Sequence, residues 1–269
     1  MSYIKLQILH CNETQISLTL QRKEIKLSKG KYEVSSLELG AEIQYTIRKV
    51  GLYLVIESAI GLSVLWDGKT TVRIILEPQH SGELCGLCGD FDGDGQNDFT
   101  TQGQLVVSNP IEFANSWKVS NQCPDVDVKA DPCGARPNRH PWSKMMCSII
   151  TGNTFKECHT KVDPLPFYDN CVKDSCACDS GGDCECFCSA VAAYAQACND
   201  ASVCVAWRTP EICPVFCDYY NKPGECKWHY NPCHKPCYKT CLSPNETCSK
   251  PLPNLEGCYP VCPEDKPIF

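Results

Sequence analysis

Residues 16–20 read Ile16-Ser17-Leu18-Thr19-Leu20, with apolar and polar side chains in alternation. Residues 4–8, Ile4-Lys5-Leu6-Gln7-Ile8, repeat the pattern. Because successive side chains of a strand point to opposite faces of a sheet, this period of two places one face on a core and the other in water. We therefore expect both segments to be β-strands.

Further strands are expected downstream of these two, within residues 44–48, 52–57, 62–66 and 71–76. Turn signals such as Gly51 and Asp67-Gly68 separate them, and no helical pattern intervenes. Closely spaced strands of this kind favour an antiparallel β-sandwich. Residues 103–119 then read as loop and turn, with Phe113 and Trp117 expected to pack on the sheets.

The cysteine content indicates the compartment, since 24 of the 269 residues are cysteine. Disulfide frameworks belong to oxidising compartments, so an extracellular or secretory-pathway protein is expected and an ordinary cytosolic enzyme is not. A net charge of −7 argues against nucleic-acid binding. No run of about 20 apolar residues is present to span a membrane. No signal peptide opens the chain, and we therefore expect a fragment of a longer precursor or an incomplete gene model.

The cysteines are unevenly distributed along the chain. Only Cys11, Cys85, Cys88 and Cys123 precede residue 131, so the first part must bury a core of its own. In the second part, helices are expected over residues 142–150, 154–162, 165–174 and 186–198. The last of these places Cys188, Val191, Ala195 and Cys198 on one face. After about residue 217, Pro, Gly, Asn and Cys predict a loop-rich fold held by cross-links.

An acidic loop follows the last expected strand and reads Asp90-Phe91-Asp92-Gly93-Asp94-Gly95-Gln96-Asn97-Asp98. Carboxylates at positions 1, 3 and 5, a glycine at 6 and an Asp at 9 match the front of an EF-hand-type Ca²⁺ loop. Position 12 is Thr101 instead of the usual bidentate Glu, so a Ca²⁺ site here needs at least one ligand from elsewhere. The alternative interpretation is a solvated acidic turn.

Cys85-Gly86-Leu87-Cys88 forms a CxxC motif. A redox-active pair belongs at a helix N-terminus within a βαβ unit, and that pattern is not found here. In so cysteine-rich a chain, two structural half-cystines are the plainer interpretation. A zinc site is disfavoured, since paired CxxC motifs at metal spacing are lacking.

A dense cysteine cluster comprises Cys176, Cys178, Cys184, Cys186 and Cys188. Neighbours at i and i+2 do not easily pair with each other, because in an extended or frayed stretch they point to opposite faces. One face can take partners within the chain, while a thiol on the other face is available to another chain. Covalent dimerisation and complete pairing within the chain both stay open at this point.

Six histidines show no catalytic spacing and are expected to be surface or packed residues, although some could respond to acidic pH: His10, His80, His140, His159, His229 and His234. Two sequons, Asn12-Glu13-Thr14 and Asn245-Glu246-Thr247, fit N-glycosylation in a secretory setting.

Three segments together resemble a D assembly of the family of von Willebrand factor and the gel-forming mucins. Cys85 to Gly93, Asn97-Asp98-Phe99 and Phe113 to Lys118 resemble the signature of a von Willebrand D domain. Cys133 to Cys217 resembles the eight-cysteine module that follows it, and the cysteine series from Cys226 to Cys262 resembles a trypsin-inhibitor-like module. The order is that of the family, and the third D assembly of secreted gel-forming mucins looks most similar.

The resemblance implies a multi-domain fold: a partial D domain built as an antiparallel β-sandwich over residues 1–125, a disulfide-rich helical module over 133–217 and a disulfide-rich loop/β module over 218–269. It implies a secreted, non-enzymatic, Ca²⁺-binding module that links mucin chains through intermolecular disulfides into the polymer of mucus. The implied partners are a second copy and other mucin chains, with no nucleic acid and no membrane insertion.

Carried onto this sequence, the resemblance implies interchain disulfides at Cys186 and Cys226, with Cys184 a weaker candidate. The implied Ca²⁺ ligands are Asp90, Asp92, Asp94, Asn97 and Asp98. The family's first strand and a Phe-Asp-Gly ligand precede the point where this chain starts. The Ca²⁺ site is therefore expected to be incomplete, and one or more of the four N-terminal cysteines to lack a partner.

Three alternatives stay open. A serine protease inhibitor would use the Leu242–Thr247 loop, which carries the sequon at Asn245. A thiol oxidoreductase would present Cys85 and Cys88 as a reactive pair. An adhesive glycoprotein like von Willebrand factor is the third.

Overall fold

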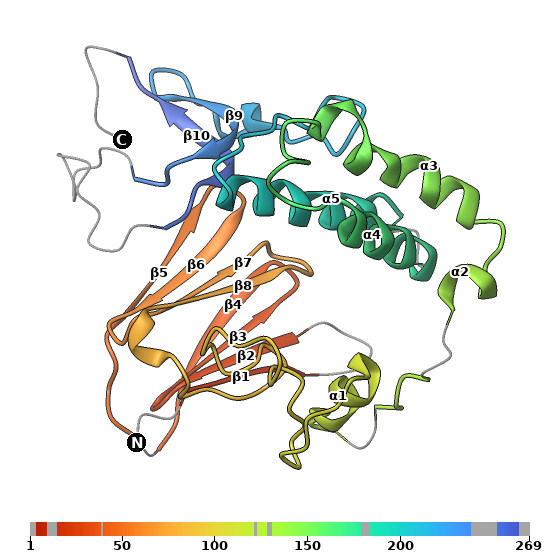
Figure 1. The fold of residues 1–269 in the computed structure, drawn as a ribbon. Coiled ribbons are helices and arrows are strands. Elements are labelled where there is room, and N and C mark those ends of the chain that lie inside the picture. Colours follow the sequence, from red (N-terminus) through yellow and green to blue (C-terminus); the bar gives the residue numbers. More distant parts are fainter. Residues whose placement is uncertain are drawn as a thin grey trace. The chain divides into compact units, whose positions relative to one another are not determined.

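The computed structural model describes residues 4–9, 15–38, 40–120, 123–127, 131–178, 183–237 and 252–263. The chain forms two compact units (Figure 1). The first comprises Met1–Lys49 and Tyr53–Ala130, and the second comprises Val50–Leu52 and Asp131–Phe269.

The first unit contains two antiparallel four-stranded sheets, which confirms the predicted sandwich. One sheet runs β1 (Ile4–Leu9), β2 (Gln15–Leu20), β3 (Lys23–Ser28) and β4 (Lys31–Ser36), and the other runs β5 (Tyr45–Val50), β6 (Tyr53–Ser58), β7 (Leu62–Trp66) and β8 (Val72–Leu76). Each strand pairs with its sequence neighbour, so both sheets are simple meanders.

The core of the first unit is built by the predicted alternation. Ile16 of β2 lies opposite Leu27 of β3, and Leu18 lies opposite Ile25, all of them buried. The same hydrophobic cluster takes residues from the other sheet: Ile56, Leu62, Val64 and Trp66. The described residues of this cluster include no cysteine, so apolar burial is the main stabilising term of the sandwich.

A helix interrupts the stretch predicted as loop. The helix α1 (Pro110–Ser116) begins at Asn109, whose side-chain oxygen accepts a hydrogen bond from the backbone N–H of Ile111 at 2.9 Å. Phe113 is buried, but it stacks on Phe99 at 5.1 Å and is not part of the sheet core. The expectation of a loop over residues 103–119 is therefore wrong for α1.

The second unit opens with helices packed around disulfides. They are α2 (Pro132–Ala135), α3 (His140–Thr151), α4 (Leu165–Ala177) and α5 (Asp183–Asp200). Three disulfides run through their core, Cys133–Cys176, Cys147–Cys171 and Cys158–Cys198.

The predicted core face of α5 is confirmed, since Val191, Ala195 and Cys198 are buried and Cys188 packs against the same cluster. The helix predicted over 154–162 is wrong. Only the 3₁₀ turn η2 (Asn153–Phe155) forms, and i→i+3 turns follow it, such as Cys158 N–H to Phe155 O.

The C-terminal part is a cross-linked hairpin. After the 3₁₀ turn η3 (Cys217–Tyr220), strands β9 (Lys227–His234) and β10 (Leu255–Val261) pair antiparallel. Cys226–Cys262 closes the open end of the hairpin, while Cys204–Cys233 and Cys217–Cys258 tie it to the segment that follows α5.

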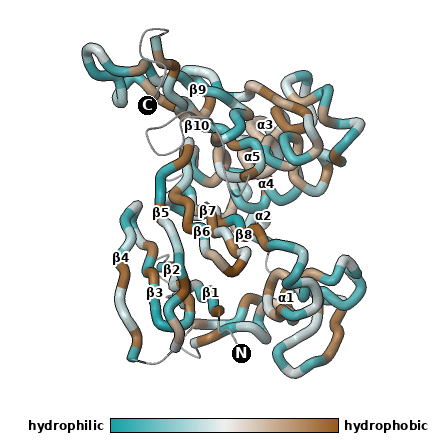
Figure 2. Tube along the Cα trace, turned by 90° about the vertical axis from the view of Figure 1, so that its left-hand side faces the viewer, coloured by the Kyte–Doolittle hydropathy of each residue, from teal (hydrophilic) through white to brown (hydrophobic). Residues whose placement is uncertain are grey.

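Hydrophobic and hydrophilic segments alternate along the chain (Figure 2). Among the described residues, no helix combines the length and the apolar character that a membrane crossing needs.

Candidate functional site

Hydrogen bonds from backbone N–H groups to the loop's own Asp carboxylates hold the acidic loop in shape. Asp90 Oδ1 accepts from the backbone N–H of Asp92 at 3.1 Å, Asp92 Oδ1 from that of Asp94 at 2.7 Å, and Asp94 Oδ1 from that of Gln96 at 3.0 Å. These are three successive Asx turns, which explains the alternation of Asp along the loop. The chain reverses through positive φ angles at Phe91 and Gly93.

Asn97 brings two of the carboxylates together. Its Nδ2 donates to Asp90 Oδ2 at 3.3 Å and to Asp92 Oδ2 at 3.1 Å. Its Oδ1 is buried and has no hydrogen-bond partner. The pKa of Asp92 lies below its ordinary value because the backbone N–H of Asp94, and then the Asn97 amide, donate hydrogen bonds to the carboxylate.

The other two predicted ligands lie at the edges of this group. Asp98 packs against Gly89, whose missing side chain leaves the space that Asp98 Oδ1 occupies. Asp94 is exposed and binds the loop backbone. The described residues contain no group of three or more His, Cys, Asp or Glu side chains arranged to hold a metal ion.

The predicted ligands nevertheless have the type of donor atom that a hard cation prefers. All five side chains offer carboxylate or amide oxygens, which are the ligands that Ca²⁺ prefers. The unpartnered oxygen of Asn97 is a buried acceptor at this loop that a cation could engage.

Cys85 and Cys88 are free thiols, and both are exposed. Their interpretation as structural half-cystines is therefore wrong for this chain, and the expectation that some N-terminal cysteines lack a partner is met by these two. Cys123 is disulfide-bonded, and Cys11 lies outside the described residues. No helix begins at the CxxC motif, so the dipole that stabilises a reactive thiolate is not supplied there.

In the described part of the cysteine cluster, no disulfide joins neighbours at i and i+2, as expected. Two cluster members take partners elsewhere in the chain, and two others bond each other eight residues apart. Cys176 bonds Cys133, Cys178 bonds Cys186, and Cys188 bonds Cys213. Each cysteine implied to link chains is thus paired internally here, Cys186 with Cys178 and Cys226 with Cys262. An interchain bond at either position requires the internal bond to open. The side chain of Cys184 lies outside the described residues.

Several other predicted features have a structural role or fall outside the described residues. His80 Nε2 hydrogen-bonds Ile60 O at 2.7 Å, and His159 Nε2 hydrogen-bonds Ile150 O at 2.9 Å. His10, the glycosylation positions Asn12 and Asn245, and the Leu242–Thr247 loop are outside the described residues.

The sequence analysis missed a polar cluster in the second unit that is formed by Arg208, Tyr230 and Glu256. A lone Arg and a lone Glu far apart in the sequence carry no pattern. Only the incongruity of Glu256 among apolar residues of a strand, Leu255-Glu256-Gly257-Cys258-Tyr259, could have drawn attention to it.

Comparison with known proteins identifies the domains. The family model of the von Willebrand factor type D domain matches residues 3–105, that of the C8 domain matches 146–214, and that of the Otogelin-like/Mucin TIL domain matches 226–269. The predicted resemblance is confirmed. The boundaries 1–125, 133–217 and 218–269 stay a prediction.

Known mucins align with almost the whole chain. Mucin-5AC of Homo sapiens is 54% identical over 94% of this chain, and Mucin-2 of Rattus norvegicus is 52% identical over 94%. Mucin-5B of Gallus gallus is 49% identical over 95%. The chain spans 4%, 17% and 12% of the length of these relatives, respectively.

Proposed function

We propose that this chain, in which von Willebrand type D, C8 and TIL domains follow one another, is a D assembly of a mucin and acts as a secreted, non-enzymatic module that links mucin chains. About half of its residues are identical to those of Mucin-5AC and Mucin-2, which is the observation that carries the proposal. Its internal disulfides are of the kind that persist in the oxidising extracellular space, which supports the proposal.

The linking chemistry proposed is thiol–disulfide exchange at Cys186 and Cys226. In a second chain, two glutathione thiols first reduce the internal bond of Cys186 or Cys226 and become one oxidised glutathione. In the exchange step that follows, the freed thiolate attacks the same sulfur of the first chain, an interchain disulfide forms, and Cys178 or Cys262 of the first chain leaves as a thiolate. The number of disulfides is conserved, so no additional oxidant is needed for this step. Cys186 is only half-buried, which favours access there, while Cys226 is 8% exposed and needs local opening.

Two sets of variants with opposite expected effects test this linkage on non-reducing gels of the secreted protein. Cys186→Ser with Cys226→Ser should leave only monomer. Cys178→Ser with Cys262→Ser frees the two proposed linking sulfurs and should increase the covalent dimer. A covalent dimer that survives the first pair, or disappears in the second, would contradict the assignment.

The acidic loop is proposed to hold Ca²⁺ through Asp90, Asp92, Asp94, Asn97 and Asp98. The unpartnered Oδ1 of Asn97 supports this, because a buried polar atom without a partner costs about 1–3 kcal/mol and a bound cation removes that cost. Bound Ca²⁺ would supply positive charge that draws the carboxylates together and rigidifies the loop.

Calorimetric titration of the full chain with CaCl₂ tests the site. Asp92→Asn and Asn97→Leu should each weaken Ca²⁺ binding at least tenfold. Glu83→Gln removes an exposed carboxylate a few residues before the loop and serves as the matched control. Equal affinity in all four proteins would reject the loop as the site and leave the linking function untouched.

A further inference from the structure

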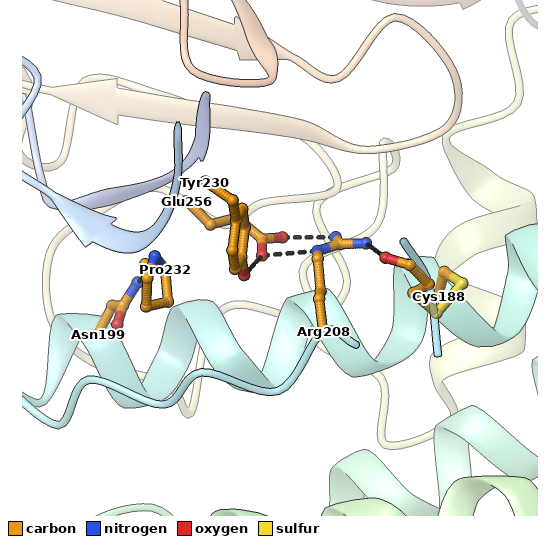
Figure 3. Close-up of polar contacts among 7 residues, drawn as sticks. Cys188, Asn199, Arg208, Tyr230, Pro232 and Glu256 are labelled. Atoms are coloured by element: carbon orange, nitrogen blue, oxygen red, sulfur yellow. Dashed lines mark hydrogen bonds and ion pairs between the residues drawn. A yellow bond between two sulfur atoms is a disulfide. The ribbon is translucent and has the colours of Figure 1, made fainter. Parts of the chain in front are cut away.

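A buried ion pair lies where the helical part of the second unit meets the β9–β10 hairpin. Arg208 Nε donates to Glu256 Oε2 at 2.8 Å, and Arg208 Nη2 donates to Glu256 Oε1 at 2.6 Å. The exposed fraction of the side chain is 12% for Arg208 and 6% for Glu256. Figure 3 shows the guanidinium and the carboxylate meeting between helix α5 and the hairpin. This bidentate arrangement is a strong and directional form of ion pair.

Both charged groups have further partners. Tyr230 OH donates to Glu256 Oε2 at 2.9 Å, and Arg208 Nη1 donates to Cys213 O at 2.9 Å. The guanidinium also lies 4.2 Å from the centre of the buried Trp207 ring. Burial, and then the negative charge of Glu256, raise the pKa of the Tyr230 hydroxyl far above its usual value, so this hydroxyl stays a donor.

An irregularity of the β9–β10 register lies at Glu256, with the additional residue in β9. The pairing register of β10 with β9 shifts between Leu255 and Gly257, and Glu256 is the residue between them. A bulge re-aims a side chain relative to the regular pleat. Sliding the hairpin by one residue would remove Glu256 from Arg208 and leave a buried charge unpaired, which is costly.

The two residues of the ion pair lie, in the sequence, near the cysteines that join the hairpin to the rest of the unit. Arg208 lies in the sequence between Cys204 and Cys217, and these two bond Cys233 of β9 and Cys258 of β10. Tyr230 is the direct cross-strand partner of Cys258. Near the end of α5, Asn199 donates a hydrogen bond to Pro232 O of β9 at 2.9 Å (Figure 3). Gln196 donates one to Asn254 O, immediately before β10, also at 2.9 Å.

We propose that the Arg208–Glu256 pair selects the partners of these four cysteines, by holding the hairpin in the one register in which Cys204 meets Cys233 and Cys217 meets Cys258. Four cysteines allow three connectivities, and the two disulfides themselves cannot form correctly until the register exists. A buried ion pair adds little net stability over apolar residues of similar size but disfavours every register that separates the charges. The pair therefore contributes specificity, and this role depends neither on Ca²⁺ nor on linkage between chains.

The choice of cysteine partners can be measured during oxidative refolding, in which the disulfides form from thiols. For each bond, two thiols lose two protons and two electrons, and one oxidised glutathione is reduced to two glutathione thiols through a mixed disulfide. The full chain, reduced and denatured, is refolded in a glutathione buffer. Non-reducing peptide mapping then gives the fraction of chains with both junction disulfides.

The double variant Arg208→Met/Glu256→Leu should lower this fraction toward about one third, the value for random pairing of four cysteines. Cys147–Cys171, in the helical core of the same chain, is the internal reference and should stay native. Arg48→Met/Glu57→Leu removes a more exposed ion pair of the first unit, with Arg48 Nε 2.7 Å from Glu57 Oε2, and should leave the junction fraction at the wild-type value. Tyr230→Phe keeps the ion pair and should also stay close to wild type.

Three results would overturn the proposal. The first is wild-type pairing in the Arg208→Met/Glu256→Leu variant. The second is a loss that affects Cys147–Cys171 in equal proportion, because the effect would then be a general folding defect. The third is a Tyr230→Phe variant as impaired as the double variant, because the tyrosine and not the ion pair would then determine the register.

Discussion

Gly89, at the start of the acidic loop, combines two constraints that only glycine satisfies. Its φ is +74°, and a Cβ there would overlap Asp98 Oδ1. Gly89→Ala should therefore lower the free energy of unfolding of the first unit by about 1–3 kcal/mol, through backbone strain and displacement of Asp98. Gly82→Ala is the matched control, because Gly82 has a φ of +71° but nothing within 4 Å of its added Cβ. Thermal unfolding followed by circular dichroism measures both, and equal losses would contradict the role of Asp98.

Asp92 sets how the loop responds to acid. Because its pKa in the fold is lowered, its ionised form contributes stability above the ordinary Asp value of 3.8, and that contribution is lost as the pH falls through the lowered pKa. A ¹³C NMR titration of the Asp92 carboxyl, in Ca²⁺-free buffer, should give a midpoint below 3.8. Asn97→Ala removes one of the hydrogen bonds to the carboxylate and should move the midpoint upward. A midpoint that does not move would show that the amide does not stabilise the ionised form.

Among the elements, the short helix α1 depends on the capping residue that precedes it, Asn109. Asn109 Oδ1 accepts from the N–H groups of Ile111 and Glu112, at 2.9 and 3.4 Å. Asn109→Ala should lower the stability of the first unit by about 0.5–2 kcal/mol, while Asn109→Ser, which keeps a capping oxygen, should cost much less. Urea unfolding monitored by Trp fluorescence compares the two variants, and equal losses would mean that the cap is not the source of the effect.

The elements also indicate which parts of this fold a sequence can predict. Strand β2 was predictable because its alternating residues face a core. Strand β4 also alternates, as Lys31-Tyr32-Glu33-Val34, but it is exposed along its whole length and was not predicted. Helix α1 is too short for a periodic pattern, and Asn109-Pro110 was its only signal. The helix predicted over residues 154–162 is not formed, although Phe155 and Cys158 are both buried. Their burial is instead achieved by successive turns and the Cys158–Cys198 bond.

The candidate sites also differ in how well the sequence predicts them. The acidic loop was predictable because its residues are consecutive and its chemistry is local. The pairing of Cys186 with Cys178, and the contact of Arg208 with Glu256, depend on how distant segments meet. The spacing of neighbouring residues predicts neither the free thiols at Cys85 and Cys88 nor that ion pair.

At the scale of the whole molecule, the two units are stabilised by different means, and this difference predicts how they respond to reduction. The core of the second unit contains seven buried cysteines, whereas the core cluster of the first has none among its described residues. Losing one native disulfide typically costs 2–5 kcal/mol and a domain is stable by about 5–15 kcal/mol, so losing several should unfold the second unit. Under dithiothreitol, hydrogen-exchange mass spectrometry should show protection lost in α3, α4 and α5 and retained in β2, β3, β6 and β7. The oxidised protein provides the reference for both units, and simultaneous loss of protection in helices and strands would mean that the sandwich has no independent core.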